Sequence, residues 1–234
     1  MSAPKAERRR LRELAARAAI ELEGAHPLEV LRWAAAEFGD RMCVSSSMTD
    51  AVLAHLASRA RPGVAVVFLD TGYHFPETIG TRDAAATVLP VTVHTVRPDA
   101  TVAEQDAAYG PRLYERDPDL CCQLRKVRPL AAALAPYSAW ISGVRRDEAP
   151  SRRDTPVVAW HERHTLVKVN PLVGWTQSDV DAYVAEHGVL VNPLVHDGYP
   201  SIGCAPCTRW VAAEADPRSG RWAGAAKTEC GIHA

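Results

Sequence analysis

Apolar residues recur along the chain in two ways, as short continuous runs and with the spacing of one helix face. The run Val64–Leu69 is continuously apolar, which is typical of a strand covered on both faces. Other segments that read as strands lie at 41–47, 91–96, 138–142 and 166–170. Helical patterns lie between them, at 50–58, 76–88, 101–108, 117–134 with an interruption at Pro129, and 176–188. Strands alternating with helices predict an α/β fold, a doubly wound and mostly parallel sheet.

Different patterns flank this alternating region. Two helices are predicted before it, over 6–23 and 27–38. From Asn192 the sequence is rich in proline, glycine and polar residues, and a mobile end is indicated by the glycines at 220, 224 and 231. We therefore expect N-terminal helices in 1–40, an α/β domain in 41–210 and a flexible tail in 211–234.

The composition narrows the class of protein. The 234 residues carry 27 basic and 28 acidic side chains, so nothing in the net charge calls for nucleic acid or an anionic membrane. No stretch approaches the ~20 apolar residues that span a bilayer, and the first ten residues do not form a secretory signal. We expect a cytoplasmic protein that binds neither nucleic acid nor membranes; the oligomeric state stays open, a homo-oligomer included. In a reducing compartment, six cysteines indicate metal binding or catalysis.

Two close pairs of cysteines are the strongest chemical signal. Cys121 and Cys122 are adjacent, and Cys204 and Cys207 form a CxxC turn that Pro206 stiffens. Four thiols in two pairs can surround one soft metal centre. Adjacent side chains on a helix diverge by about 100°, so they reach two irons of a cluster more easily than one zinc ion. The pattern favours an iron–sulfur cubane over a single zinc, and four unrelated buried cysteines are the plain alternative.

The other two cysteines differ in their surroundings. Cys43 lies inside a predicted strand and is expected to be a buried spectator. Cys230 lies in the glycine-flanked tail, a poor place for a core residue and a good place for a nucleophile that moves between partners. Lys126 lies four residues after Cys122, so on a helix it shares that cysteine's face and could reach an anionic substrate.

Three segments at predicted strand ends have the character of anion sites. The serine loop 45–47 lies between a strand and a helix N-terminus, where N–H groups and hydroxyls converge; an ordinary helix cap by Ser47 or Thr49 is the alternative. The turn 70–72 follows the next strand, and the carboxyl ends of parallel strands share one edge of the sheet. Four arginines within 145–153 indicate either phosphate recognition or a solvated loop.

These residues together resemble one protein family over most of the chain, from about Cys43 to His233. The adjacent cysteines, the turn Gly203-Cys-Ala-Pro-Cys207 and the terminal Glu229-Cys-Gly-Ile-His233 are similar to signatures of the assimilatory adenylyl-sulfate (APS) reductases of bacteria and plants. That family belongs to the wider phosphoadenylyl-sulfate (PAPS) reductase group. The terminal ECGIH is typical of the whole group, and the two cysteine pairs are typical of its APS-using branch. The resemblance implies an adenine nucleotide alpha hydrolase-like fold.

The resemblance also implies a reaction and a role for each motif. The family reduces APS to sulfite and AMP: the tail cysteine, here Cys230, attacks the sulfate sulfur, AMP leaves, and reduced thioredoxin releases sulfite from the adduct. His233 and nearby cations are expected to lower the pKa of Cys230. A [4Fe–4S] cluster is implied on Cys121, Cys122, Cys204 and Cys207. Substrate contacts are implied for Lys126, Arg218, Arg221 and His233, for Ser45, Ser46 and Ser47, for Leu69 to Gly72, and for Arg145 and Arg146.

One departure and three alternatives accompany this resemblance. Many relatives have a loop of the form Ser-x-Ser-Gly-Ala-Glu-Asp, whereas Ser45-Ser-Ser-Met-Thr-Asp50 is one residue shorter and lacks the glycine. A PAPS reductase is the alternative within the same class, which competition between the two nucleotides would distinguish. An ATP pyrophosphatase-type adenylating enzyme would need ATP and magnesium and would not need Cys230. A zinc-structured binding module would be colourless and would show no thiol-dependent turnover.

Overall fold

The sheet at the centre of the fold has six strands in the order β3-β2-β1-β4-β6-β5. The structure is a computed structural model that describes residues 5–224 and 227–233; residues 1–4, 225–226 and 234 of the two predicted terminal segments lie outside it. Each neighbouring pair from β3 to β6 is parallel, which confirms the predicted doubly wound, mostly parallel α/β sheet. The strand bounds are β1 Met42–Ser45, β2 Val64–Leu69, β3 Val91–Val96, β4 Ala139–Ile141, β5 Val158–His161 and β6 Leu166–Val169.

The edge strand β5 is the one strand of this sheet that the sequence pattern did not predict. It pairs antiparallel with β6, with Val158 opposite Val169 and His161 opposite Leu166. Its four residues are too few to show a clear alternation of buried and exposed positions. Pairing with β6 and packing against the first helix therefore decide its conformation, which is a tertiary effect.

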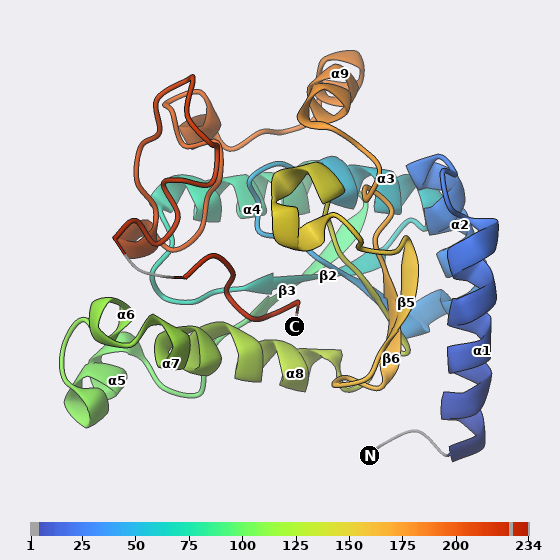
Figure 1. The fold of residues 1–234 in the computed structure, drawn as a ribbon, viewed down its shortest axis with the longest axis horizontal. Helices are drawn as coiled ribbons and strands as arrows, with labels where there is room; N and C mark the ends of the chain where they lie inside the picture. Colours follow the sequence, from blue (N-terminus) through green and yellow to red (C-terminus); the bar gives the residue numbers. More distant parts are fainter. Residues whose placement is uncertain (1–4, 225–226, 234) are drawn as a thin grey trace.

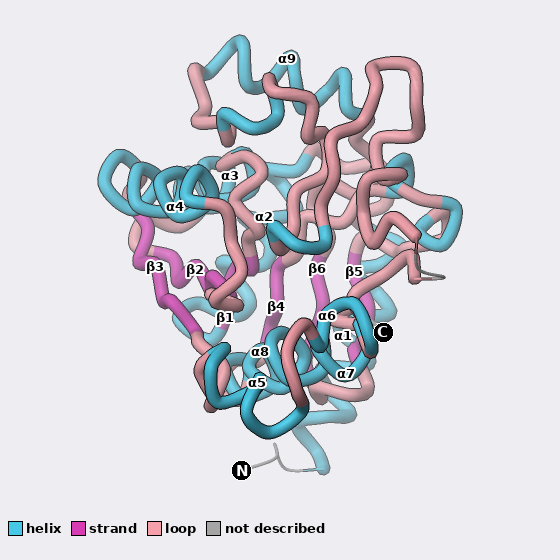
Figure 2. The backbone as a smooth tube through the Cα atoms, turned by 90° about the vertical axis from the view of Figure 1, so that its left-hand side faces the viewer, coloured by secondary structure: helices cyan, strands magenta, loops and turns pink. Residues whose placement is uncertain are grey.

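Helices cover both faces of the sheet, as Figure 1 shows and the view turned by 90° in Figure 2 makes clearer. α2, α3 and α4 lie over one face, α8 lies over the other, and α1 packs along β5 and β6. The helices predicted at 27–38 and 76–88 have those bounds. The bounds are α1 Lys5–Glu21, α2 Pro27–Phe38, α3 Val52–Ala60, α4 Pro76–Val88, α5 Val102–Tyr109, α6 Leu113–Arg116, α7 Pro118–Cys122, α8 Arg128–Leu134 and α9 Gln177–His187.

The long helix predicted over 117–134 is divided by a π-helical turn at Gln123–Val127. The interruption lies just before Pro129, which occupies the first turn of α8. Proline has no N–H group for the bond to the carbonyl four residues earlier, and its ring crowds that carbonyl. The wider π turn accommodates this loss, and such turns are frequent at functional sites. It also carries Lys126, so the turn decides where this cation points.

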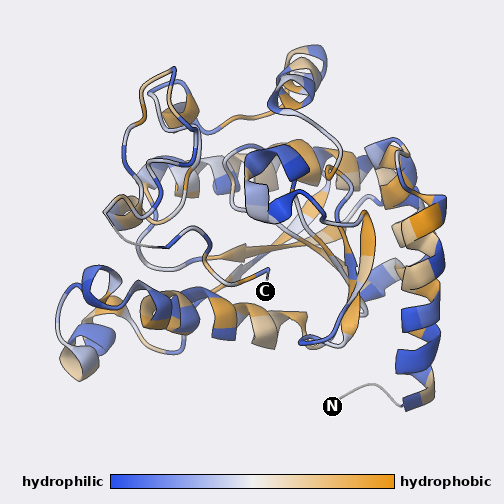
Figure 3. Cartoon of the chain, in the orientation of Figure 1, coloured by the Kyte–Doolittle hydropathy of each residue, from blue (hydrophilic) through white to orange (hydrophobic). Residues whose placement is uncertain are grey.

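Two hydrophobic clusters hold the layers together. The larger joins α1, α2, α3 and α9 to one face of the sheet. The smaller lies under α8 and contains Cys43, Trp140 and Leu130, which confirms Cys43 as a buried residue. Figure 3 shows mainly hydrophobic strands between helices that carry both hydrophobic and hydrophilic residues. Across the described parts of the chain, none of the helices has both the length and the apolar character needed to cross a membrane.

The described end of the chain lies between the two helical layers, at the centre of Figure 1. Ile232 packs against the smaller cluster, which contains side chains from α8 and the sheet. Residues 227–233 are therefore placed on the body of the α/β fold. The predicted mobility of the segment 211–234 stays a prediction.

Candidate active site

The strand order reverses between β1 and β4. From β1 the chain extends the sheet through β2 and β3, and it then crosses back to β4 and β6 on the other side. Loops at the carboxyl ends of two such strands leave a crevice that binds ligands. The serine loop follows β1 and the segment 142–155 follows β4. A hydrogen bond joins the two strands here, because Trp140 Nε1 donates to Ser45 Oγ at 2.7 Å.

The serine loop does not serve as the cap of α3. The N-cap residue of α3 is Ala51 and no side chain caps the helix; Asp50 Oδ1 accepts a hydrogen bond from Val52 N at 2.9 Å in the turn that leads into it. The alternative of a helix cap by Ser47 or Thr49 is therefore wrong. Ser47 is exposed, and its hydroxyl lies 3.3 Å from that of Thr49. Ser46 Oγ accepts a hydrogen bond from the backbone N–H of Met48.

The turn after β2 is held in place by Arg125, a residue that the sequence did not single out. Arg125 is buried; its Nε donates to the carbonyl oxygen of Thr71 and its Nη1 donates to Gln105 Oε1 at 3.1 Å. Gly72 has a φ of 74°, and a Cβ there would approach Arg125 Nη2 at 3.1 Å. Leu69 to Gly72 is thereby fixed against the segment that carries the adjacent cysteines.

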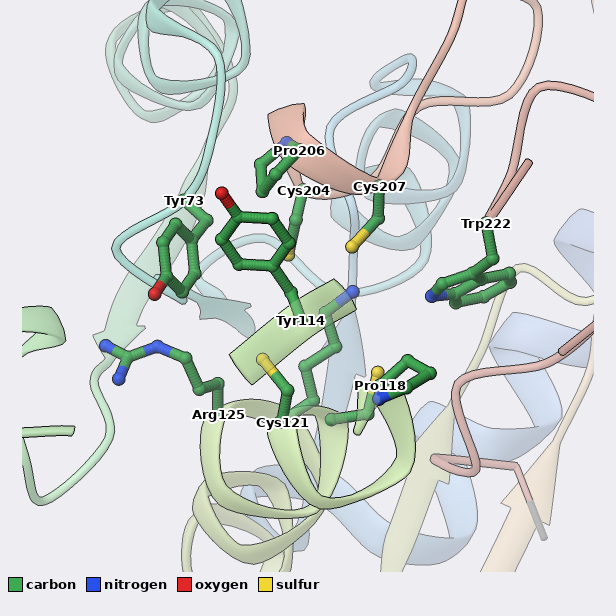
Figure 4. A pocket seen from close by; sticks show the side chains of 11 residues that line it. Tyr73, Tyr114, Pro118, Cys121, Arg125, Cys204, Pro206, Cys207 and Trp222 are labelled. Carbon is green, nitrogen blue, oxygen red and sulfur yellow. The ribbon is translucent and has the colours of Figure 1, made fainter. Parts of the chain in front are cut away.

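The two cysteine pairs meet across one small pocket, which Cys121, Cys122, Cys204 and Cys207 line together with Lys126. In Figure 4, Cys204 and Cys207 extend from the short helical turn Ala205–Cys207, and Cys121 extends from α7 on the opposite side. More than 80 residues separate the two pairs in the sequence. Unrelated buried cysteines have no reason to converge in this way.

The CxxC turn is tied to the turn after β2. Cys204 Sγ lies 3.3 Å from Thr71 Oγ1, and Ala205 N donates to the carbonyl oxygen of Tyr73 at 2.7 Å. Burial, together with the neighbouring thiols, raises the pKa of Cys121 to about 12 and that of Cys207 to about 11. Thiolates crowded in this way are stabilised when a bound metal centre supplies positive charge.

The pocket does not have the form of a site for one ion. Among the residues the structure describes, no group of three or more His, Cys, Asp or Glu side chains is arranged to hold a single metal ion. A cubane cluster has a different requirement, since its four irons are spread in space and each takes one thiolate. Four free thiols that converge from two segments offer one ligand for each iron of such a cluster.

Lys126 lies between the cysteine pocket and the end of the chain. Burial lowers its pKa, but the electrostatic effect of the neighbouring cysteines Cys204 and Cys230 outweighs this, so the pKa is raised overall and the side chain is a cation. Because Lys126 lines the cysteine pocket and interacts electrostatically with Cys230, the tail cysteine lies near that pocket. The sequence predicted that Lys126 lies on the same helix face as Cys122, and the structure adds an interaction with Cys230.

Arg221 approaches the same region from the segment after the CxxC turn. Its guanidinium lies 4.6 Å from the ring centroid of Trp222, and its Nη1 donates to Ser201 Oγ at 3.2 Å. A side chain at position 203 would collide with this guanidinium, so the glycine of the GCAPC turn makes room for it. Arg221 also interacts electrostatically with Cys230.

The residue before Cys230 anchors the end of the chain. Glu229 Oε1 accepts a hydrogen bond from Arg152 Nε and Glu229 Oε2 accepts one from Arg152 Nη2, both at 2.8 Å. Arg218 Nη2 donates to Glu229 Oε2 at 3.3 Å and to the carbonyl oxygen of Thr228 at 2.9 Å. Two-point contacts between a guanidinium and a carboxylate are strong and directional. Cys230 is therefore presented from an anchored position.

The residue at the far side of Cys230 is anchored by stacking. The His233 ring lies parallel to the Trp140 ring, with centroids 5.4 Å apart and an interplanar angle of 12°. Burial lowers the pKa of His233 well below its usual range, and the cations Lys168 and Arg152 lower it further. The ring is neutral at pH 7, so the positive charge near Cys230 comes from Lys126 and Arg221 instead.

Two predicted substrate residues of the arginine run 145–153 have partners away from the cysteines. Arg145 donates to Asp147 Oδ1 at 3.1 Å, and Arg146 binds Glu23 at the end of α1 through two nitrogens, at 2.6 and 3.0 Å. The structure does not bring these guanidinium groups to the cysteines. Arg152 of the same arginine run does reach the end of the chain, and nothing in the sequence pattern distinguishes the members of the run.

The fold and this site define an α/β nucleotide-binding protein of the adenine nucleotide alpha hydrolase-like class, with a cysteine-based site at the strand ends. Residues 41–210 match the model of the phosphoadenosine phosphosulfate reductase domain, and the chain belongs to that family. It is 65% identical to the adenosine 5′-phosphosulfate reductase of Streptomyces coelicolor, over 95% of this chain and 94% of the relative. Identity to the adenosine 5′-phosphosulfate reductase of Mycolicibacterium smegmatis is 57%, with the same coverage.

Solved structures share the fold of this chain. A phosphoadenylyl-sulfate reductase from Candida auris, in a phosphate complex, superposes with a TM-score of 0.73 at 29% identity and covers 90% of this chain and 99% of its own. The FMN adenylyltransferase of Candida glabrata superposes with a TM-score of 0.55 at 12% identity, over 76% of this chain and 61% of its own. This second likeness shows a shared fold alone.

Proposed function

We propose that this protein reduces adenosine 5′-phosphosulfate to sulfite and AMP, with electrons from thioredoxin, as a step of sulfate assimilation. The observation that carries the proposal is the position of Cys230, anchored through Glu229 on one side and His233 on the other, near two cations and the nucleotide crevice. The activity named for the relatives at 57 and 65% identity supports the same substrate. We infer a cytoplasmic location, because the reaction consumes reduced thiols.

In the first step, the Cys230 thiolate attacks the sulfur of the sulfate group. A bond forms between Cys230 Sγ and this sulfur, the bond from the sulfur to the bridging oxygen breaks, and AMP leaves with the electron pair on its phosphate. Lys126 and Arg221 offset the negative oxygens of the substrate that would repel the nucleophile. The product is an S-sulfonate on Cys230.

In the second step, a thiolate of reduced thioredoxin attacks Cys230 Sγ. The bond between the two sulfur atoms of the adduct breaks, sulfite leaves with the electron pair, and a mixed disulfide forms. The second thioredoxin thiol resolves this disulfide and returns Cys230 as a thiol. Thioredoxin supplies both electrons, so the tail must expose Cys230 after it has reacted in the crevice.

The cysteine pocket is the proposed site of a [4Fe–4S] cluster held by Cys121, Cys122, Cys204 and Cys207. When bound, the cluster supplies a compact negative charge beside Lys126 and a covalent link between α7 and the Ala205–Cys207 turn. The residues of the chain do the rest: Lys126 and Arg221 bind the phosphosulfate, and the serine loop Ser45–Ser47 and Leu69 to Gly72 hold the nucleotide.

We propose APS rather than PAPS as the preferred substrate. The two cysteine pairs support this choice, because they are typical of the APS-using branch. The solved phosphoadenylyl-sulfate reductase from Candida auris keeps PAPS as the second candidate. Arg145 and Arg146, whose guanidinium groups already bind Asp147 and Glu23, stay predictions as substrate residues.

The test uses anaerobically purified protein with APS or PAPS, reduced thioredoxin and a sulfite assay. We expect a catalytic efficiency for APS at least a hundredfold above that for PAPS. Without thioredoxin, APS labelled with ³⁵S should leave label on the peptide that contains Cys230, and Cys230→Ser should fold, bind APS and make no sulfite. Label on Cys43, or turnover by the serine variant, would assign the chemistry to another residue. Equal efficiency with both nucleotides would refute the preference.

A further inference from the structure

The terminal segment contacts the helix that carries the adjacent cysteines. Lys227, three residues before Cys230, donates from its Nζ to Asp119 Oδ1. Asp119 lies on α7, which ends with the two adjacent cysteines, and the two partners are 108 residues apart in the sequence. This contact is separate from the anchor at Glu229, which ties the same segment to Arg152 after β4.

Lys227 is by far the less exposed partner of this ion pair. Its side chain is 9% exposed, whereas the side chain of Asp119 is 83% exposed. The ammonium lies 5.7 Å from the ring centroid of Trp222, which lines the cysteine pocket at the right of Figure 4. Burying an ammonium group is costly, and an ion pair with an exposed carboxylate contributes little. The burial of Lys227 therefore calls for a further negative charge.

The cysteine pocket is the source of such a charge. Burial raises the pKa of Cys122, and the nearby cations Lys126 and Lys227 act against this effect. Cys230 also interacts electrostatically with Cys122, so Lys227 and Cys230 both lie near this member of the first cysteine pair. A buried free thiol is neutral, whereas a thiol that binds a metal centre is deprotonated. The negative charge that faces Lys227 is therefore present when a metal centre is bound.

The position of Lys227 also limits where Cys230 can lie. Three residues of extended chain span at most ~10 Å, so a lysine held on α7 keeps the nucleophile near the pocket. Without the charge of a bound centre, Lys227 retains only the exposed carboxylate of Asp119, and the segment is held less firmly at this end.

We propose that Lys227 is a positioning residue, which makes the closed position of Cys230 depend on a cluster in the cysteine pocket. The inference rests on the proposed function, because that function supplies both the cluster and the role of Cys230. In that reaction thioredoxin supplies both electrons, so the cluster has no electrons to donate. Its contribution through Lys227 is a charge that holds the nucleophile where the substrate binds.

The test measures how fast iodoacetamide alkylates Cys230 in cluster-loaded and in iron-free protein, by mass spectrometry of its peptide at low conversion. Lys227→Met removes the charge and keeps most of the length of the side chain, and Lys227→Arg keeps the charge. Arg209→Met removes an exposed cation from the same part of the chain and is the matched control. Alkylation of the buried Cys43 reports unfolding in each sample.

We expect iron removal to speed the alkylation of Cys230 in the wild type about tenfold, which corresponds to ~1.4 kcal/mol, while Cys43 stays unmodified. Cluster-loaded Lys227→Met should already react about tenfold faster than the wild type, and iron removal should then add less than about threefold. Lys227→Arg and Arg209→Met should match the wild type in both forms. A merely structural lysine would give two independent effects that multiply.

Two results would overturn the inference and leave the proposed function standing. One is cluster-loaded Lys227→Met that reacts at the wild-type rate, and the other is an equal response of the wild type and Lys227→Met to iron removal. An iron-free anaerobic preparation of the wild type, or sulfite formed by Cys230→Ser, would instead refute the proposed function. If Cys43 also reacts, iron loss has unfolded the chain, and equal rates of cluster-loaded Lys227→Met and Lys227→Arg would then overturn the inference.

Discussion

Arg152 and Glu229, which are 77 residues apart in the sequence, form a two-point ion pair with both nitrogen–oxygen distances at 2.8 Å. The pair lies next to Cys230 in the chain, and Arg218 adds a third contact to the same carboxylate. The position of the nucleophile therefore depends on an interaction between two segments that meet only in the folded protein.

Removing the charge of Glu229 should loosen the end of the chain. In Glu229→Gln, the loss of a charge-assisted contact of about 1.5 to 3 kcal/mol should shift the tail toward an open form. We expect Cys230 to react with iodoacetamide about tenfold faster, as measured on its peptide by mass spectrometry. The control is Glu214→Gln, an exposed glutamate of the same region. Equal rates in the two variants would contradict an anchoring role.

Loss of one cysteine of the pocket should cost the protein its cluster. The wild type, purified without oxygen and with iron supplied, should be brown and contain four irons and four sulfides. Cys204→Ser should lose iron and unfold at lower urea concentration, since the cluster ties two distant segments together. Cys43→Ala, outside the pocket, should keep its iron. A zinc-containing, iron-free wild type would show that the pocket holds a different centre.

The two arginines of the segment after the CxxC turn should respond differently to truncation. Arg218→Ala and Arg221→Ala should each raise the KM for APS by about thirtyfold, as expected for the loss of ~2 kcal/mol of charge-assisted binding. Arg221→Ala should also lower the free energy of unfolding, because its guanidinium packs on Trp222 and bonds to Ser201. Unchanged KM values in both variants would count against their placement at the substrate.

Stability should fall between pH 6.5 and pH 4 because of His161. Burial, with His164 and Lys168 nearby, lowers the pKa of His161 from 6.5 to about 4. In this range the unfolded state binds a proton that the folded state does not, so the folded state loses stability as the pH falls. The ring is half-exposed, so we expect about 1 kcal/mol between pH 7 and pH 5 after allowing for solvent screening.

His161→Asn should remove that part of the pH dependence. Urea unfolding at pH 7 and pH 5 would measure it, with His94→Asn on the exposed edge strand β3 as the control. A variant with the same pH dependence as the wild type would show that other groups cause the loss.

Gly220→Ala should destabilise the segment that carries Arg221. The added Cβ would collide with the carbonyl oxygen of Arg209, which belongs to the backbone and cannot move away like the end of a side chain. Overpacking of this kind costs about 1 to 3 kcal/mol. Gly174→Ala, where a Cβ meets nothing within 4 Å, is the control. Equal free energies of unfolding for Gly220→Ala and Gly174→Ala would refute the collision.

Much of the architecture could be read from local patterns. The buried run of β2, the proline that begins α4 and the capping residues Thr176 and Asp179 of α9 act within a few residues of themselves, so the sequence shows them directly. β5 and the π turn before Pro129 escaped prediction. The first depends on pairing with β6, and the second depends on how the helix adapts to a missing N–H.

The sequence by itself determined the class of chemistry, because a CC pair, a CxxC turn and a tail cysteine are chemical groups whatever their surroundings. It also determined that the strand ends carry hydroxyls and cations. Only the tertiary structure decided which of them meet: Arg152 rather than Arg145 or Arg146 binds Glu229, and Lys168 lies over the Trp140 ring. A charged side chain gains its partner from residues that are distant in the chain, and the fold alone fixes those distances.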